Sequence, residues 1–120
     1  MIKKRTPETY LPLSAPVFHV LLALADGEKH GYAVSKEIAR RTGNEVRLSA
    51  GTLYGIIKRL LDEGLIEESE DRPDFSLDDE RRRYYRLSRL GFRVAEAEAE
   101  RMQRVLRLAR SKNVMAAEQT

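Results

Sequence analysis

Positively charged side chains concentrate in one part of this sequence and are its best candidates for chemistry. Between residues 81 and 93 there are six arginines and no acidic residue, whereas between 65 and 80 eight acidic residues accompany a single arginine. So abrupt a change of sign gives one edge of the molecule a positive potential that attracts phosphate groups. The alternative is that these arginines are solvated and pair with the neighbouring acids, because exposed ion pairs contribute little energy.

Residues suited to catalysis or metal binding are sparse. The two histidines, His19 and His30, have no carboxylate or third ligand at a recognisable spacing. Asp78 and Asp79 lie in a polar stretch where burial would not raise a pKa. The sequence has no cysteine, which excludes thiolate metal sites and disulfides and fits a reducing compartment. We therefore expect a non-enzymatic protein without a metal or cofactor.

A helix predicted over residues 49–63 presents the most distinctive polar surface. Its apolar side chains recur at steps of three and four and form one buried arc of Leu53, Ile56, Ile57, Leu60 and Leu61. Ser49 is suited to cap its first turn, and Gly64 is suited to end it in the left-handed conformation. The opposite arc carries small, hydroxylated and cationic residues: Gly51, Thr52, Tyr54, Gly55, Lys58 and Arg59. Such an arc can approach a nucleic-acid groove closely.

The elements around this helix predict a winged helix-turn-helix fold, mainly α with a small β-hairpin. Helices are expected over 14–26, capped by Ser14 and stopped by Gly27, and over 31–41. Two strands are expected over 65–69 and 82–88, with room for one short strand within 44–48. The chain of 120 residues fits a single DNA-binding domain over 14–88, preceded by a flexible basic arm over 1–13. In this order of elements the helix over 49–63 is the one that reads DNA.

A further helical stretch runs from residue 88 to about residue 112. Its apolar residues alternate at steps of three and four, as in a coiled-coil seam: Phe92, Ala95, Ala99, Met102, Leu106 and Ala109. We predict a dimerisation helix over 89–112, with a contribution from the first helix, and a disordered tail over 113–120. The alternative is that the seam packs against the protomer's own first helix.

Three linked motifs resemble those of the PadR-like transcriptional regulators. They read LSAPVFHVLLALADGEKHGYAVSKEI, SAGTLYGIIKRLLDEGLIE and RRRYYRLSRLG, and the resemblance covers about residues 11–110. It implies a homodimeric DNA-binding repressor of the shorter subfamily, in which the C-terminal region is one helix. It also implies that the major-groove contacts are made by Ser49, Thr52, Tyr54, Lys58 and Arg59, and that Tyr32 lies near the DNA backbone.

The sequence departs from that family in two places. Gly55 stands where members often have proline, and Asp78, Asp79 and Glu80 precede Arg81 where many members have a basic wing. Relatives respond to phenolic acids or planar cationic drugs. By that resemblance the candidates for a small aromatic effector site at the dimer interface are Phe18, Phe92 and Met102, although such side chains are also typical of an ordinary core.

Two functions are compatible with these observations. The first is a transcriptional regulator, acting as a homodimeric repressor on a palindromic operator, with further DNA contacts from the strand residues Arg81, Arg83 and Arg86. The second is a winged-helix module that docks an acidic protein partner on the same arginines. The longest apolar run, Val20 to Ala25, is too short to cross a membrane, so we expect a cytoplasmic protein with no membrane partner.

Overall fold

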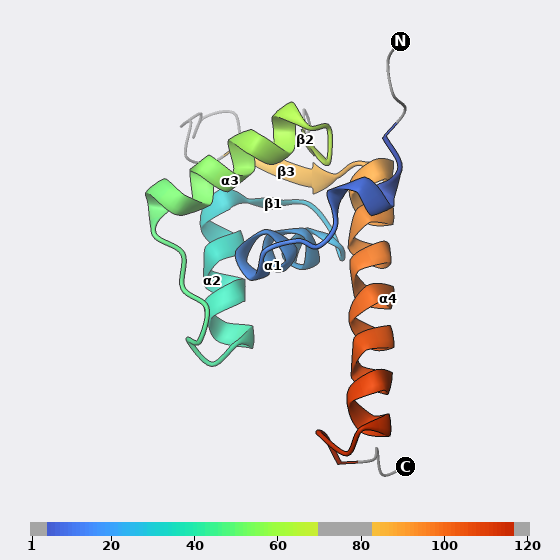
Figure 1. Ribbon diagram of the computed structural model, residues 1–120. Coiled ribbons are helices and arrows are strands. Elements are labelled where there is room, and N and C mark those ends of the chain that lie inside the picture. Colours follow the sequence, from blue (N-terminus) through green and yellow to red (C-terminus); the bar gives the residue numbers. More distant parts are fainter. Residues whose placement is uncertain (1–4, 70–82, 117–120) are drawn as a thin grey trace.

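Four α-helices, one 3-10 helix and three short strands make up the part of the chain that the computed structural model describes, residues 5–69 and 83–116 (Figure 1). In chain order they are η1 (Pro7–Tyr10), α1 (Ala15–Leu24), β1 (Lys29–His30), α2 (Gly31–Arg41), α3 (Ala50–Asp62), β2 (Ile66–Glu68), β3 (Tyr84–Leu87) and α4 (Arg89–Ser111). The predicted architecture, mainly α with a small hairpin, is confirmed. The acidic stretch between β2 and β3, with Arg81, lies outside the described residues.

The three strands form one antiparallel sheet in the order β1-β3-β2, with β3 in the centre. Lys29 lies opposite Tyr85, and Ile66 lies opposite Leu87. Along β3 the side chains alternate as predicted, since Tyr85 is buried and Arg86 is exposed. The additional strand is Lys29–His30 and does not lie within 44–48 as expected. A strand of two residues is too short to show an alternating pattern in the sequence.

Serine hydroxyls cap α1, α3 and α4. Ser14, Ser49 and Ser88 accept hydrogen bonds from the backbone N–H groups three residues ahead, at 3.4, 3.2 and 3.0 Å. After α3 the chain turns at Gly64, whose φ of +74° is the left-handed conformation that glycine adopts readily. The predicted caps at Ser14 and Ser49 and the predicted stop at Gly64 are confirmed.

The hydrophobic core lies where α1, α2, α3, the sheet and the start of α4 meet. From α3 it takes Leu53, Ile57 and Leu60, which are buried, while Ile56 and Leu61 pack at its border. The apolar arc of α3 therefore faces inward as predicted. Its polar arc is turned to the outside.

The two halves of α4 have different surroundings. In the first half Gly91, Val94, Ala95 and Glu98 are buried against the domain. The second half extends past the other elements (Figure 1), and its apolar side chains are exposed: Met102 by 43%, Val105 by 53%, Leu106 by 40% and Leu108 by 58%. Part of the predicted seam thus packs on the protomer itself, and the remainder is uncovered in the single chain.

The described residues before α1, 5–13, differ from the flexible arm expected over 1–13, of which residues 1–4 lie outside the described part. Pro7–Tyr10 form η1, which packs on α4, and Tyr10, Leu11 and Leu13 border the core. The Leu13 backbone N–H also donates to the Glu98 Oε2 atom at 2.7 Å. Leu13 and Glu98 are 85 residues apart along the chain, so no local sequence pattern predicts this contact.

Glu98 attaches this segment to α4 through a buried carboxylate that is 1% exposed. Its second oxygen, Oε1, accepts a hydrogen bond from Arg101 Nε. The hydrogen bond from Arg101 lowers the pKa of Glu98 below its ordinary value; burial opposes that change, and the Leu13 N–H supports it. The carboxylate therefore prefers its charged form at this position.

The start of α4 is fixed directly to the end of α3. The Ser88 hydroxyl donates to the Gly64 carbonyl at 2.6 Å, and the Ser88 N–H donates to the Leu65 carbonyl at 3.1 Å. Gly91 then passes so close to this corner that a Cβ on it would lie 1.9 Å from the Leu65 carbonyl oxygen. A side chain at position 91 would force the two elements apart.

Replacing Gly91 by alanine is expected to destabilise the fold by about 1 to 3 kcal/mol, because the methyl group overlaps a backbone atom that cannot rotate away. The matched control is Gly55→Ala, since Gly55 lies within α3 with no atom in the way of a Cβ. Gly55→Ala should be neutral or stabilising by up to about 1 kcal/mol. Urea unfolding measures both changes, and equal effects of the two substitutions would contradict the close approach.

Glu98→Gln is expected to lower stability at pH 7 by about 1 to 3 kcal/mol, because it removes a charged acceptor from two hydrogen bonds. Since the pKa of Glu98 is lowered in the fold, its stabilising contribution is complete above the ordinary value and disappears as the pH falls through the lowered value. The difference from wild type should therefore shrink in acid. Urea unfolding across pH measures it, with Glu96→Gln as an exposed control on α4; a difference independent of pH would contradict the role of the charge.

Candidate nucleic-acid interface

The outer arc of α3 forms an exposed polar strip, and the predicted major-groove contacts lie on it or at its border: Ser49, Thr52, Tyr54, Lys58 and Arg59. The exposed members are Gly51, Thr52, Gly55, Lys58 and Arg59. A Cβ at Gly51 or Gly55 would meet no atom within 4 Å, so no side chain covers the helix backbone at these two positions. A large partner can therefore come close to the backbone of the helix.

At the N-terminal end of the strip, Ser49 and Thr52 are joined by their side chains. The Ser49 hydroxyl accepts from the Thr52 N–H at 3.2 Å and donates to the Thr52 Oγ1 atom at 3.1 Å. The Thr52 hydroxyl proton is then available to an outside acceptor such as a phosphate oxygen or a base edge. The cap thus orients a donor at the helix end.

Tyr54 also belongs to the predicted set, but it is half-buried at the contact between α3 and α2. Its hydroxyl lies so close to Gly31 that a Cβ on Gly31 would be 2.7 Å from the oxygen. Tyr54 also acts on the nearby hydroxyl of Tyr85, whose pKa is raised mainly by burial and to a smaller extent by Glu68 and Tyr54. Tyr54 therefore holds the two helices together as well as bordering the strip.

The two cations of the strip differ in their partners. Lys58 makes no ion pair within residues 5–69 and 83–116. Arg59 lies one turn before Glu63, with Nε 2.9 Å from the Glu63 Oε1 atom, and Arg5 approaches the same carboxylate at 4.0 Å. Lys58 therefore offers an uncompensated charge to a phosphate, whereas the Arg59 Nε donor is engaged and its charge is partly compensated by Glu63.

The predicted strand arginines are paired as well. Arg83 Nε lies 3.5 Å from the Glu68 carboxylate, and Arg86 Nε lies 3.3 Å from the Glu67 carboxylate across the sheet. The pairing of arginines with nearby acids, which the sequence left as an alternative, is therefore present for these two residues. Both pairs are partly exposed and are expected to contribute little stability.

Tyr32, predicted to lie near the DNA backbone, is 58% exposed on the first turn of α2. Its ring lies parallel to that of His30 at 6.3 Å, and the His30 ring meets Tyr84 edge-on at 5.6 Å. His30 also caps α2, since its Nδ1 atom accepts from the Ala33 N–H at 3.1 Å. Tyr32 is thus supported by β1 and β3.

Sequence reasoning missed Arg47, which stands two residues before Ser49. Its side chain is exposed, and no ion pair holds it within the described part of the chain. It is therefore a free cation at the end of α3 that a helix-turn-helix inserts into the major groove. The signal that could have found it is a basic residue two positions before the predicted cap.

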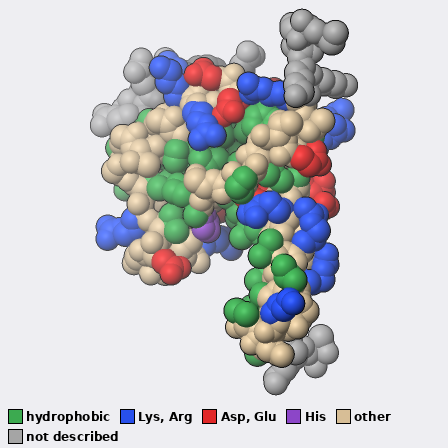
Figure 2. Space-filling model, viewed as in Figure 1, with side chains coloured by type: hydrophobic (Ala, Val, Ile, Leu, Met, Phe, Trp, Pro, Cys, Tyr) green, Lys and Arg blue, Asp and Glu red, His purple; other side chains and the backbone are tan. Residues whose placement is uncertain are grey.

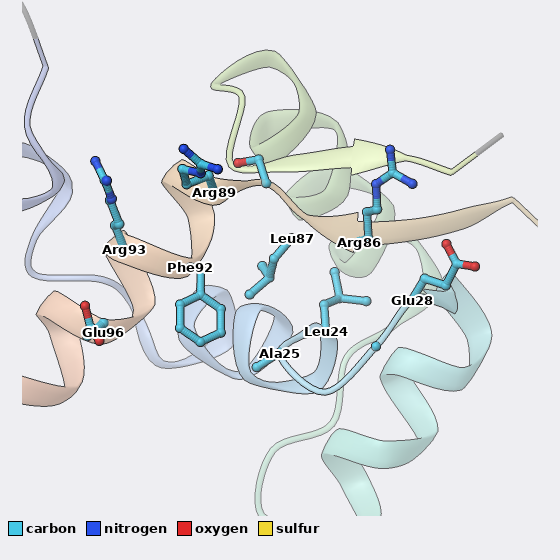
Figure 3. Close-up of a pocket in the computed structure, with 11 residues that line it drawn as sticks. Leu24, Ala25, Glu28, Arg86, Leu87, Arg89, Phe92, Arg93 and Glu96 are labelled. Carbon is cyan, nitrogen blue, oxygen red and sulfur yellow. The ribbon is translucent and has the colours of Figure 1, made fainter. Parts of the chain in front are cut away.

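The three predicted effector residues are not brought together. Phe92 lines a hollow of about 780 Å³ between the end of α1, β3 and the start of α4, together with Leu24, Leu87 and three arginines (Figure 3). Phe18 packs against the core, and Met102 is exposed about three turns further along α4. The effector site therefore stays a prediction, with Phe92 as its best-placed member.

Comparison with known proteins identifies the family. The model of the transcriptional regulator PadR-like family matches residues 20–97. The chain belongs to this family. Its members are transcriptional regulators and not enzymes, which confirms the expectation of a non-enzymatic protein.

Two curated relatives have no established function. Uncharacterized protein X of Lysinibacillus sphaericus is 35% identical over 72 residues, which cover 60% of this chain and 63% of that protein. An uncharacterized 37.1 kDa protein in transposon Tn4556 of Streptomyces fradiae is 37% identical over 86 residues, which cover 72% of this chain and 22% of that protein. The chain thus matches less than two thirds of the length of each.

Solved structures share the fold. A PadR family transcriptional regulator from Eggerthella lenta is 29% identical, with a TM-score of 0.62 and coverage of 92% of this chain and 87% of that one. A transcriptional regulator from Clostridium thermocellum is 22% identical, with a TM-score of 0.64 and coverage of 92% and 97%. Bacillus subtilis PadR in complex with operator DNA is 22% identical, with a TM-score of 0.60 and coverage of 72% and 47%. They confirm the predicted winged-helix fold with a C-terminal helix.

Residues 5–69 and 83–116 contain neither a candidate metal site nor a candidate membrane span. No cluster of three or more histidine, cysteine, aspartate or glutamate side chains there could hold a metal ion. None of the helices in those residues combines the length and the apolar character that crossing a membrane requires.

Proposed function

We propose that this protein is a sequence-specific DNA-binding repressor that acts as a homodimer on a palindromic operator. The observation that carries the proposal is the polar strip of α3. A helix anchored by Leu53, Ile57 and Leu60 presents small, hydroxylated and cationic groups outward, at the place of the reading helix in a helix-turn-helix. Bacillus subtilis PadR, which has the same fold, was solved with operator DNA.

In this proposal the N-terminal end of α3 enters the major groove. Ser49 and Thr52 then face base edges or phosphates, Arg47 and Lys58 bind phosphates on either side, and Tyr32 and Tyr54 border the backbone. Arg83, just before β3, and Arg86 on β3 extend the contact along the duplex, and Arg81, predicted to join them, lies outside the described residues. A neighbouring carboxylate partly compensates the charge of Arg59, Arg83 and Arg86, so their net contribution is smaller than that of an unpaired cation.

The second half of α4 supports the dimer. Its exposed apolar residues continue the face that is buried in the first half, and Figure 2 shows hydrophobic side chains gathered on this projecting part. Glu100, Arg104 and Arg107 are exposed on the other side of the helix. A second copy that covers the apolar face in a twofold arrangement would place two copies of α3 at a fixed separation.

An effector would act on this arrangement through the hollow beside Phe92, which lies between the end of α1 and the start of α4. A small aromatic molecule bound there could change the angle of α4 and release the operator. We place the effector at this hollow as part of the proposal.

Lys58→Gln is expected to weaken binding to the DNA upstream of the protein's own gene and to make the dependence of log K on log salt less steep. One phosphate contact is lost in each protomer, so the slope should change by about 1.8 for a dimer. Arg59→Gln is the matched comparison, and its effect on the slope should be smaller because Arg59 is paired with Glu63. Gel shifts with excess nonspecific competitor, repeated over a salt series, measure both.

Two results would contradict the DNA proposal. The first is the absence of a retained band for the wild-type protein at modest salt, which would favour the module that docks an acidic protein. The second is an unchanged salt slope in Lys58→Gln, which would remove the strip of α3 from the contact surface. Unchanged affinity in both Arg83→Gln and Arg86→Gln would remove these two arginines from the contact surface and would leave the proposed role of α3 intact.

Leu106→Glu is expected to convert the dimer to a monomer at micromolar concentration, because it places a charge on the exposed apolar face of α4. Arg107→Glu is the control, since it introduces the same side chain at the next residue, about 100° around the helix on its exposed polar face. Light scattering gives the mass of each variant. A monomeric wild type, or a Leu106→Glu variant that stays dimeric, would refute the interface.

A further inference from the structure

Lys36 is an exposed cation on α2, the helix that packs against α3. Its Nζ atom lies 4.8 Å from the centre of the Tyr32 ring, one turn back along the helix. Tyr32 follows Gly31, the residue over which α2 meets Tyr54 of α3. The Lys36 side chain therefore extends back along α2, toward the N-terminal end of the helix, where Gly31 contacts Tyr54 of α3.

The support beneath Lys36 is a short stack of rings. Tyr84 of β3 meets His30 edge-on, His30 lies parallel to Tyr32, and Lys36 lies over Tyr32. A cation over an aromatic face is attracted by the π electrons and keeps its N–H donors available to other acceptors. Lys36 is therefore positioned in advance without being neutralised.

The acids of this region are occupied by other cations. The Glu37 carboxylate lies 3.6 Å from Lys29 Nζ and 3.7 Å from Arg41 Nε, and Asp26 lies 2.5 Å from the same lysine. Lys36 makes no ion pair within residues 5–69 and 83–116. A positioned, unpaired and exposed ammonium group is suited to a phosphate oxygen, because a strong donor meets a full negative charge there.

We propose that Lys36, held on the Tyr32 ring, binds a backbone phosphate of the duplex beside the groove that α3 enters. This inference rests on the proposed DNA-binding function and adds α2 to the contact surface. The contact carries no base readout, so it fixes the position of the protein on the duplex and raises affinity for all sequences alike. Lys36 is thus a positioning residue for the reading helix.

The test compares three variants on a duplex that the wild type binds. Lys36→Gln should make the log-log salt slope less steep by about 1.8 for a dimer, and Lys36→Arg should keep the wild-type slope. Arg41→Gln, which removes an equal charge from the same helix at a residue paired with Glu37, should leave the slope unchanged. Ethylation interference should show one phosphate in each half-site that matters to the wild type and not to Lys36→Gln.

The possible failures are distinguishable. If Lys58→Gln lowers the slope but Lys36→Gln does not, the inference is overturned and the proposed function stands. Equal effects of Lys36→Gln and Arg41→Gln would also overturn it, because charge in general would then explain the loss. If the wild-type protein binds no DNA, the proposed function fails and the inference fails with it.

Discussion

The close contact between the end of α3 and the start of α4 determines the rest of the arrangement. Gly64 turns the chain, Ser88 donates to the Gly64 and Leu65 carbonyls, and Gly91 allows α4 to pass against that corner. Because α3 carries the polar strip and α4 carries the exposed apolar face, this junction sets the angle between the surface proposed to meet DNA and the surface proposed to meet a second copy. Glu98 adds a second attachment, which ties the segment before α1 to the same helix. A dimer built on so fixed an angle holds its two reading helices at one separation.

The cations of this protein fall into two groups, those paired with a carboxylate and those without an ion pair to the described residues. Lys29, Arg41, Arg59, Arg83, Arg86 and Arg101 each lie beside a carboxylate. Lys36, Arg47 and Lys58 are exposed on the helix-turn-helix and make no ion pair with the described residues. Exposed ion pairs contribute little to stability, but they compete with phosphate for the cation. The sign of the local field can therefore be read from the sequence, whereas the cations that are free to act can be read only from the fold.

Local patterns in the sequence predicted much of this structure, because the relevant interactions span one helical turn. The caps at Ser14 and Ser49, the bounds of α2, the inward arc of α3 and the glycine stop at Gly64 all depend on neighbours within a few residues. The errors concern contacts between distant segments. Residues 7–13 lack a helical period and gave no sign of packing on α4, and β1 is recognisable only through its pairing with β3. The ion pairs of Arg83 and Arg86 depend on strand register, and the site of Tyr54 depends on the approach of α2 at Gly31.

The central claim is that two copies of α3 are presented to duplex DNA at a fixed separation, and selection of bound sequences from a random DNA pool tests it most directly. The account predicts recovery of a palindrome whose half-site centres lie about one helical turn apart, near 34 Å along the duplex. Recovery of a single unsymmetrical site, of half-sites at variable spacing, or of no enriched sequence would contradict it.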